Sequence, residues 1–309
     1  MKTIITEEMR FREKVVKFAI KHGNNAAAAR RYHTSRQQVQ RWRLKYDGTT
    51  KSLANKSTRP KSHPNQHTEE ELKLIKEKHK RFAFEGLAQV YRKLLDAGYT
   101  RSFGSMQRQL RKIKVKPQHK PKRYPKSKFT PLSGTFPGEF VEIDIKFVPS
   151  ACIGFSSEFH KYYQITAIDL FSRKRVLKLV TENSTWETSN FLYNLEKEMG
   201  FKIQTVQTDN GREFCNDENE PKSRFELVLE HLGIEYKRTR PYSPWQNGVV
   251  ERSHRIDDNI FYSRRRFNSE EELRKSFERY ATRTNNISKT VLKFKTPNEM
   301  VTEYYEKVA

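Results

Sequence analysis

The sequence predicts an α/β protein in which two small all-α modules precede a larger domain built on a mixed sheet. Residues 8–113 hold short helical patterns in two groups of three. Residues 139–149, 162–170 and 174–180 alternate apolar and polar side chains, as strands with one buried face do. Beyond them, helical and strand patterns alternate, which is typical of a sheet covered by helices on both faces.

Composition narrows the class of partner. The chain has 309 residues, enough for two or three domains, and a formal net charge of +24 at pH 7. Nucleic acid is the best match for this charge, because the basic residues are spread over several segments. The only cysteines, Cys152 and Cys215, indicate a reducing cytoplasm and exclude a disulfide framework. We expect no membrane partner, since no apolar run approaches the roughly 20 residues of a bilayer span.

Residues 1–48 are predicted to form a helix-turn-helix module. Met9 to Ala19 supply the apolar stripe of a first helix, the Asn24 region offers a cap for a second, and Ser35 caps a third. In such a module the last helix lies in the major groove, where Arg and Gln side chains read base edges. A small helical bundle with a solvated basic face is the alternative. The predicted DNA contacts are Arg36, Gln37, Gln40 and Arg41.

Residues 49–67 lack periodicity and are rich in Ser, Thr, Pro and Lys, which predicts a basic linker. Residues 68–115 repeat the three-helix plan and start at Thr68, a cap residue followed by three acids. We predict a second helix-turn-helix module that offers Arg108 and Arg111 to DNA. A further basic linker, 116–131, contains no acid and suits contact with phosphates, although it cannot specify a base sequence.

Residues 132–268 are predicted to form the α/β domain, with a C-terminal helical extension at 269–309. After the first three strands we expect a helix at 185–199, a strand ending before Asp209, a helix at 223–232, a short strand at 234–237 and a long helix at 245–267. On the 185–199 helix, Trp186, Phe191, Leu192 and Leu195 are predicted to face the core.

Three acidic residues stand out within this domain. Asp144 lies in the middle of a strand, on its polar face, although strands disfavour Asp. Asp209 ends a strand at a turn signal, with its carboxylate directed out of the core. On the long helix, Glu251 shares a face with Asn247, while Val250 points elsewhere. Taken singly, these are ordinary residues of a solvated strand, an Asx turn and a helix-surface ion pair.

Together, the three acids can converge on one rim of the sheet. Oxygen ligands without His or Cys suit Mg²⁺ or Mn²⁺. Two such ions about 4 Å apart clamp the attacking and leaving oxygens of an in-line phosphoryl displacement. We therefore predict that Asp144, Asp209 and Glu251 are catalytic and bind two Mg²⁺ (or Mn²⁺) ions per active site. The sequence has no phosphate-cradling loop of the P-loop type, so ATP is not required.

Four motifs, in this order along the chain, carry a resemblance to a known family. They are VEIDIK, AIDLFSRKRV, QTDNGREF and RTRPYSPWQNGVVERSHR. The chain resembles the DDE transposases and retroviral-type integrases, and in particular bacterial insertion-sequence transposases of the IS481 and IS3 type. The family's catalytic core has an RNase H-like fold with the order Asp, Asp, Glu. The resemblance covers nearly the whole chain.

The resemblance assigns roles position by position. It implies metal-binding roles for Asp144, Asp209 and Glu251. It also implies that residues around them shape the site and contact DNA near the scissile phosphate, and that two more support it. The implied DNA contacts are Asn210, Gln246 and Asn247, and the supporting residues are Asp169 and Gly211.

The resemblance implies a transposase that binds the terminal inverted repeats of an insertion sequence, cleaves there, and joins the strands to target DNA by transesterification. Its partners would be double-stranded DNA, at transposon ends and target, and further copies of itself, at least a dimer in the synaptic complex. It would act in a bacterial cytoplasm, associated with the nucleoid. The alternative is an inactive or domesticated relative, a sequence-specific DNA-binding regulator that needs the helical modules but not the carboxylates.

Two stretches depart from the family's pattern. From Asp209 to Glu251 there are 251 − 209 = 42 positions, more than is usual in the family. We place the excess in residues 215–222, an acidic surface loop that need not move Glu251. Near the C-terminus, residues 282–300 lack the family's Asn followed by Arg-Pro-His, and the match is limited to Thr296-Pro297 and the residues after them.

Overall fold

The computed structural model describes residues 5–55, 60, 63–113, 132–156, 161–217, 219–240 and 243–309. The chain divides into two compact units, residues 1–66 and residues 67–309. The predicted linker at 116–131 lies outside the described residues. None of the helices in the described part of the chain combines the length and the apolar character that a membrane crossing requires.

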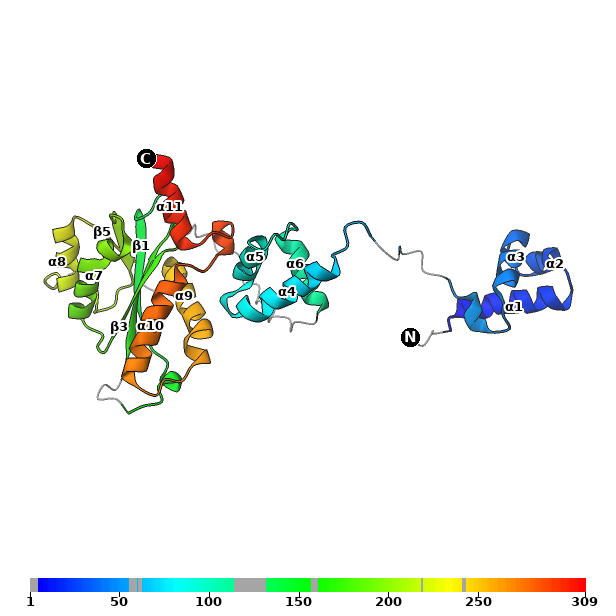
Figure 1. The fold of residues 1–309 in the computed structure, drawn as a ribbon, viewed down its shortest axis with the longest axis horizontal. Coiled ribbons are helices and arrows are strands. Elements are labelled where there is room, and N and C mark those ends of the chain that lie inside the picture. The colour runs from blue at the N-terminus through cyan, green and yellow to red at the C-terminus, as the bar shows by residue number, and fades with distance from the viewer. Residues whose placement is uncertain are drawn as a thin grey trace. The chain divides into compact units, whose positions relative to one another are not determined.

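Three helices form the first module: α1 (Glu7–Lys21), α2 (Asn25–Arg31) and α3 (Arg36–Lys45) (Figure 1). They begin where the sequence predicts, because Asn24 and Ser35 accept hydrogen bonds from the first free backbone N–H groups of α2 and α3. The core of the module comprises Val15, Val16, Ala19, Ala28, Val39 and Trp42.

The predicted boundary at residue 48 is wrong. Residues Thr50–Leu53 form a 3₁₀ helix, and Leu53, 1% exposed, completes the core of the first module. The Arg12 guanidinium donates a hydrogen bond to the Leu53 carbonyl over 2.9 Å. Leu53 is the one large apolar side chain in an otherwise polar stretch, so its burial outweighs the linker-like composition around it.

The second module contains α4 (Glu69–Phe82), a 3₁₀ helix (Ala83–Glu85), α5 (Leu87–Leu95) and α6 (Phe103–Lys112). Thr68 caps α4 in a reciprocal arrangement with Glu71, as the sequence predicts. The buried residues of this module include Ile75, Val90, Leu94, Met106 and Leu110.

In the described residues, the α/β domain has a five-stranded sheet with the order β3-β2-β1-β4-β5. The strands are β1 (Phe140–Phe147), β2 (Tyr163–Asp169), β3 (Arg175–Val180), β4 (Thr205–Thr208) and β5 (Glu235–Arg238). The first three pair antiparallel, whereas β4 pairs parallel with both β1 and β5. The predicted mixed sheet is therefore confirmed.

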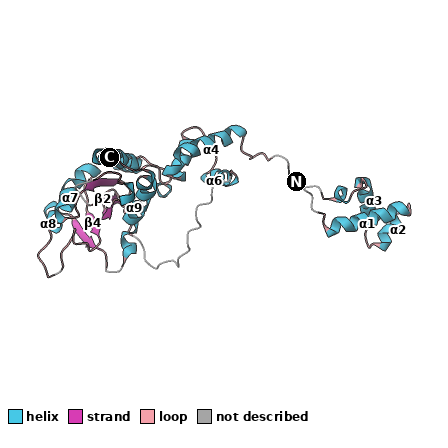
Figure 2. Ribbon diagram, turned by 90° about the horizontal axis from the view of Figure 1, so that it is seen from below, coloured by secondary structure: helices cyan, strands magenta, loops and turns pink. Residues whose placement is uncertain are grey.

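Helices cover both faces of this sheet. They are α7 (Thr185–Met199), α8 (Arg224–Leu232), α9 (Gly248–Ile260), α10 (Glu270–Thr284) and α11 (Pro297–Val308). Figure 1 shows α7 and α8 on one side of the strands and α9 and α10 on the other. In Figure 2 the magenta strands lie between the cyan helices. Short 3₁₀ helices occur at Ser150–Cys152, Pro244–Asn247, Tyr262–Arg264 and Thr290–Leu292.

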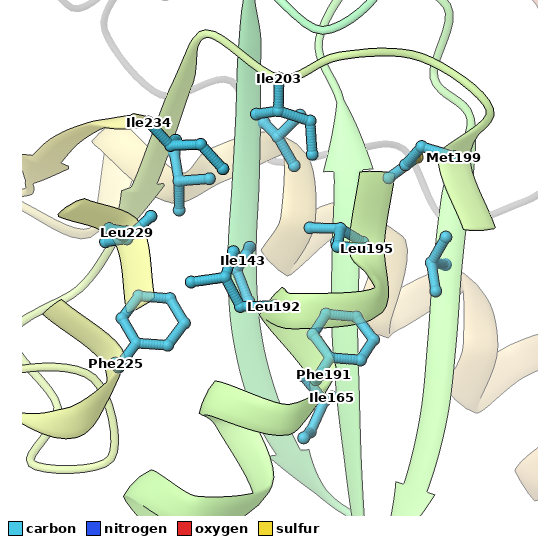
Figure 3. Close-up of a cluster of buried hydrophobic side chains, with 14 of the residues drawn as sticks. Ile143, Ile165, Phe191, Leu192, Leu195, Met199, Ile203, Phe225, Leu229 and Ile234 are labelled. Carbon is cyan, nitrogen blue, oxygen red and sulfur yellow. The ribbon is translucent and has the colours of Figure 1, made fainter. Parts of the chain in front are cut away.

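The main core lies between the sheet and the α7–α8 layer. Ile143 and Ile165 project from β1 and β2 toward Phe191 and Leu195 of α7, with Phe225 of α8 alongside (Figure 3). Side chains alternate along β1, so Val141 and Ile143 enter this core while Glu142 and Asp144 face α9. A second apolar cluster beneath α10 includes Leu177, Phe261, Phe267, Leu273 and Phe277.

Two details differ from the sequence prediction. Trp186 is 51% exposed and stacks under the Arg224 guanidinium, because Phe191, Leu192 and Leu195 define an inward stripe that excludes it. The long helix predicted at 245–267 is instead a 3₁₀ turn, α9 and a second 3₁₀ turn. It stops after Ile260 because the chain turns to pair Phe267 with Cys152, whose carbonyl accepts the Phe267 N–H over 2.8 Å.

Candidate active site

The strand register brings the first two predicted acids together. In the parallel pair of β1 and β4, Val141 lies opposite Val206 and Glu142 opposite Gln207. Carrying this register on by two residues in each strand places Asp144 beside Asp209, the residue that follows the end of β4. The turn after β4 is an Asx turn, in which the Asp209 carboxylate accepts the Gly211 N–H over 3.1 Å. Asp209 can therefore form the Asx turn and also lie beside Asp144.

Helix α9 is held along β1 by three polar contacts. They pair Glu142 with Val250, Asp144 with His254, and Lys146 with Asp258. Successive partners are two residues apart on the strand and four apart on the helix. Two residues of a strand rise about 6.8 Å and four residues of a helix about 6 Å. The two repeats nearly match, so each partner on β1 lies opposite its partner on α9. The outward face of β1 thereby fixes both the position and the rotation of α9.

The contacts themselves are specific. The Val250 N–H at the start of α9 donates to a Glu142 carboxylate oxygen over 2.8 Å. Nδ1 of His254 lies 3.4 Å from an Asp144 carboxylate oxygen. The Val250 side chain is fully buried, whereas Glu251 is exposed, so the two side chains point in different directions. The inward face of α9 comprises Val250, His254 and Asp257, and Glu251 lies at the exposed border of that face.

The charges of the predicted carboxylates affect the pKa values of Asp144 and Glu251. Burial raises the pKa of Asp144 to about 7, and the negative charges of Asp209, Glu251 and Glu213 add to the shift. Burial also raises the pKa of Glu251; the Arg255 charge opposes this, and the Asp209 charge reinforces it. Asp144, Asp209 and Glu251 therefore share one electrostatic environment at the end of β4.

Three predicted DNA-contact residues instead connect the loops around the site. Asn247 is 4% exposed and accepts a hydrogen bond from the Gln207 side chain over 3.1 Å. The Gln246 side chain accepts the Arg240 N–H over 2.8 Å, and the Asn210 amide donates to the Thr239 carbonyl over 2.9 Å. Because Asn247 is buried, its side chain does not reach DNA in this conformation, and it joins β4 to the start of α9 instead.

The two residues predicted to support the site lie at turns. Asp169 is fully buried and accepts hydrogen bonds from the Gly138 N–H over 2.9 Å and from the Ser172 N–H over 2.7 Å. It therefore holds the β2–β3 turn against the start of β1. At Gly211 a Cβ would lie 2.7 Å from the carboxyl carbon of Glu213, so the glycine leaves room for this acid near the site.

Sequence reasoning assigned no role to three groups of the site, although it placed Glu142 on the strand face of Asp144 and His254 on the helix face of Glu251. Burial raises the pKa of Glu142 to about 7, and the Val250 N–H partly offsets this. Burial lowers the pKa of His254 to about 4, so its imidazole is neutral at physiological pH. Glu213 adds negative charge near Asp144. The signal for Glu142 was present, since it shares a strand face with Asp144, whereas nothing in the sequence pattern distinguished Glu213.

The donor set suits a hard divalent cation, because it consists of carboxylate oxygens whose mutual repulsion a cation would relieve. Across the ranges that the structure describes, no three His, Cys, Asp or Glu side chains form a ready metal-ligand cluster. The fit thus rests on the chemistry and charge of Asp144, Asp209 and Glu251.

The predicted DNA-contact residues of the modules lie at the surface. On α3 the inward positions are taken by Val39 and Trp42, and on α6 by Met106 and Leu110. The exposed residues are Arg36, Gln37, Gln40 and Arg41 on α3 and Arg108 and Arg111 on α6.

Comparison with known proteins agrees with this geometry. Residues 135–244 match the family model of the integrase core domain, and residues 232–287 match a second integrase core domain model. Residues 11–61 match a helix-turn-helix domain. A stretch of 98 residues, 31% of this chain, is 35% identical to the "Retrovirus-related Pol polyprotein from transposon TNT 1-94" of Nicotiana tabacum. It spans only 7% of that protein's length.

Solved structures of viral integrases are also similar. The simian T-cell lymphotropic virus intasome in complex with PP2A regulatory subunit B56 gamma gives a TM-score of 0.45 at 18% identity, over 72% of this chain and 74% of the other. The magnesium complex of the HTLV-2 integrase catalytic core domain, in its trimeric form, gives 0.41 at 17% identity, over 54% of this chain and 98% of the other.

The family matches, the mixed sheet and the order of the motifs agree with one another. Residues 135–287 of this chain therefore form an integrase core domain of the DDE transposase and integrase kind, built on a mixed sheet, and residues 11–61 form a helix-turn-helix domain.

Proposed function

We propose that the chain is the transposase of an insertion sequence of the IS481 or IS3 type. It binds the terminal inverted repeats of the element, cleaves DNA there, and joins the ends to target DNA by transesterification. The observation that carries this proposal is the shared electrostatic environment of Asp144, Asp209 and Glu251, three acids from separate parts of the sequence.

In this proposal Asp144, Asp209 and Glu251 hold Mg²⁺ or Mn²⁺, two ions per site, which supply Lewis-acid stabilisation of the reacting oxygens. The protein's own contribution is to fix the carboxylates. Asp144 is held by its strand and by His254, and Glu251 by the anchoring of α9 on β1. Neutral His254 places no positive charge beside Asp144.

Basic residues next to the carboxylates suit the DNA backbone. Arg252 and Arg255 are exposed on α9, and the Arg255 charge acts on Glu251. Guanidinium groups at such positions bind phosphate oxygens in bidentate fashion. We assign them to holding the strand whose phosphodiester is attacked.

The helical modules supply binding to the element's ends. Exposed Arg and Gln residues on α3 and α6 suit base edges and phosphates of duplex DNA. Joining two ends requires two active sites, so we propose at least a dimer on DNA.

The test is a strand-transfer assay with labelled duplexes that carry the DNA flanking the gene, in Mg²⁺ or Mn²⁺. We expect cleavage and joining by the unmodified protein, and loss of both in Asp209→Asn. Asp217→Asn is the matched control, because Asp217 is an exposed acid in the same connecting loop and pairs with Arg212 away from the sheet.

The competing function is a DNA-binding regulator without catalysis. It predicts sequence-specific binding to the same duplexes and no metal-dependent cleavage. Full activity of Asp209→Asn, with its fold verified by circular dichroism, would also refute the assignment of the carboxylates.

A further inference from the structure

The second helical module is attached to the end of the catalytic domain by contacts that lie far apart in the sequence. The Arg283 guanidinium, at the end of α10, donates to both carboxylate oxygens of Glu85 over 2.8 and 2.9 Å. The Glu85 side chain is 4% exposed. A buried carboxylate is costly without a cation, so this two-point contact strongly favours the docked arrangement.

A buried amide adds a second contact. Gln89 on α5 is 1% exposed, and its side-chain oxygen accepts the Ser288 N–H over 2.9 Å. Buried polar groups in native proteins are almost always paired. Here the partner of a side chain in the helical module is the backbone of the catalytic domain. Arg92 of the same helix also bonds Glu299 at the start of α11 over 2.9 Å.

An aromatic side chain completes the interface. The Phe294 ring lies 4.7 Å from Tyr91 and 5.0 Å from Phe103, measured between ring centroids, and joins the core of the module. Lys293 and Phe294 have φ angles of 52° and 68°, a left-handed conformation that costs free energy for residues with side chains. The packing of Phe294 compensates for this cost. Apart from Glu299, the contacts on the catalytic side lie in residues 283–294, within the stretch that departs from the family's pattern.

The interface continues toward the catalytic carboxylates. Asn285, just after α10, bonds the backbone N–H of Arg175 over 2.8 Å and its carbonyl over 2.7 Å. The buried Arg175 guanidinium bonds Asp257 on α9 over 2.7 Å. Helix α9 carries Glu251. A contiguous set of packed and hydrogen-bonded groups thus joins α5, the end of α10, β3 and α9.

We propose that the second module and the integrase core act as one rigid body, which fixes the distance from α6 to the catalytic carboxylates. This inference rests on the proposed function, because in that function the fixed distance sets where on the bound DNA the phosphodiester is attacked. Four positioning residues hold this distance, which we call the fixed register: Glu85, Gln89, Arg283 and Phe294.

The first experiment needs no DNA. Spin labels are attached at Lys112→Cys on α6 and Lys197→Cys on α7, both exposed sites, in a chain with Cys152→Ala and Cys215→Ala. Pulsed electron paramagnetic resonance then gives the distribution of distances between the labels. We expect a single narrow peak that a short Gly-Ser insertion within residues 116–131 leaves unchanged.

Variants locate the cause of the rigidity. Arg283→Glu opposes Glu85 with a like charge and should replace the narrow peak by a broad distribution. Adding Glu85→Arg should restore the narrow peak. Arg279→Glu makes the same charge change one turn earlier, at an exposed position of α10 that hydrogen-bonds Lys275 and Ser276 of its own helix, and should have no effect. A broad distribution in the unmodified protein, or a narrow one in Arg283→Glu, overturns the proposal.

The second experiment maps cleavage on labelled duplexes of the flanking DNA with Mn²⁺. The unmodified protein and the insertion variant should cut at the same nucleotide, and Arg283→Glu should lose this single position. A cut that shifts with the insertion refutes the fixed register. If the unmodified protein cuts nothing, the proposed function fails, while the distance measurement still decides whether the rigid body exists.

Discussion

The two helical modules follow the same plan but differ in how they are attached. The first, residues 5–55, closes its own core with Leu53 from its own 3₁₀ helix. The second, residues 67–113, takes Phe294 into its core from a segment that follows α10. The first is part of a compact unit of its own, whereas the second belongs to the same unit as the catalytic domain.

The difference comes from a few polar positions. In the second module Glu85 and Gln89 are buried and have partners in the catalytic domain. In the first module the Arg and Gln side chains of α3 that are named above as DNA contacts are exposed. Burial of a polar group is tolerated only with a fixed partner, so these two residues commit the second module to one arrangement. Similar hydrophobic patterns therefore do not imply the same polar contacts with the catalytic domain.

The largest expected effect comes from deleting each module in turn and measuring the melting temperature of the remaining chain. Without residues 1–66, the remaining chain should keep the melting temperature of its own cooperative transition, because the core clusters described for residues 67–309 contain only residues of that unit. Without residues 67–113, Phe294 and Arg283 lose their partners, and we expect this transition to fall by about 10 °C or more. Differential scanning calorimetry measures both. Equal melting temperatures for the two truncated chains would show that the second module is only tethered.

A single ion pair gives the next largest effect. Arg283→Met leaves the buried Glu85 carboxylate without a cation and should lower the free energy of unfolding by about 2–3 kcal/mol. Lys275→Met, also on α10, breaks the exposed pair with Glu271 and should leave the free energy of unfolding nearly unchanged. Urea unfolding of residues 67–309 measures both values. Similar costs for the two variants would argue against a committed interface.

Binding to DNA sharpens the contrast further. The double variants Arg36→Ala with Arg41→Ala and Arg108→Ala with Arg111→Ala should each lower affinity by about 10- to 100-fold. Only the second pair lies on the rigid body, so only that pair should also alter where DNA is cut. Fluorescence anisotropy over a series of salt concentrations measures affinity, and Lys197→Ala is the control. Unchanged affinity in either double variant removes that helix from the interface with DNA.

The smallest expected effect depends on pH. Burial, together with the Arg175 charge, lowers the pKa of Lys289 from 10.5 to about 8. The charged amine is therefore less favourable in the folded state, and its cost is complete below pH 8 and vanishes as the pH rises toward 10.5. Lys289→Met should raise the free energy of unfolding by about 1–2 kcal/mol at pH 7 and by less at pH 10. The same gain at both values, from urea unfolding, would contradict this account.

Much of the fold could be predicted because its signals are local. Cap residues such as Asn24, Ser35 and Thr68 mark helix starts, and the α7 bounds follow from apolar spacing alone. The family resemblance identified the acids of the site, and the parallel register of β1 and β4 explains why two of them meet. The metal-binding roles remain a prediction.

The features that escaped prediction depend on contacts between distant segments. Nothing near Phe294 indicates that it packs on Tyr91, and nothing near Glu85 indicates Arg283 as its partner. The rotation of α7 that exposes Trp186 is a compromise among all its packing contacts. The anchoring of α9 also required knowledge of which face of β1 the helix covers.

The contacts that align α9 with β1 bear on how relatives of this chain can vary. Glu142, Asp144 and Lys146 on β1 fix the position of α9. The length of the chain between Asp209 and Glu251 therefore does not determine where Glu251 lies. That connection can gain or lose residues, as the 42 positions in this chain illustrate, while the third acid returns to the same spot. The number of residues between the second and third acids is thus a poor criterion for recognising such enzymes. Contacts that repeat every two residues on the strand and every four on the helix are a better one.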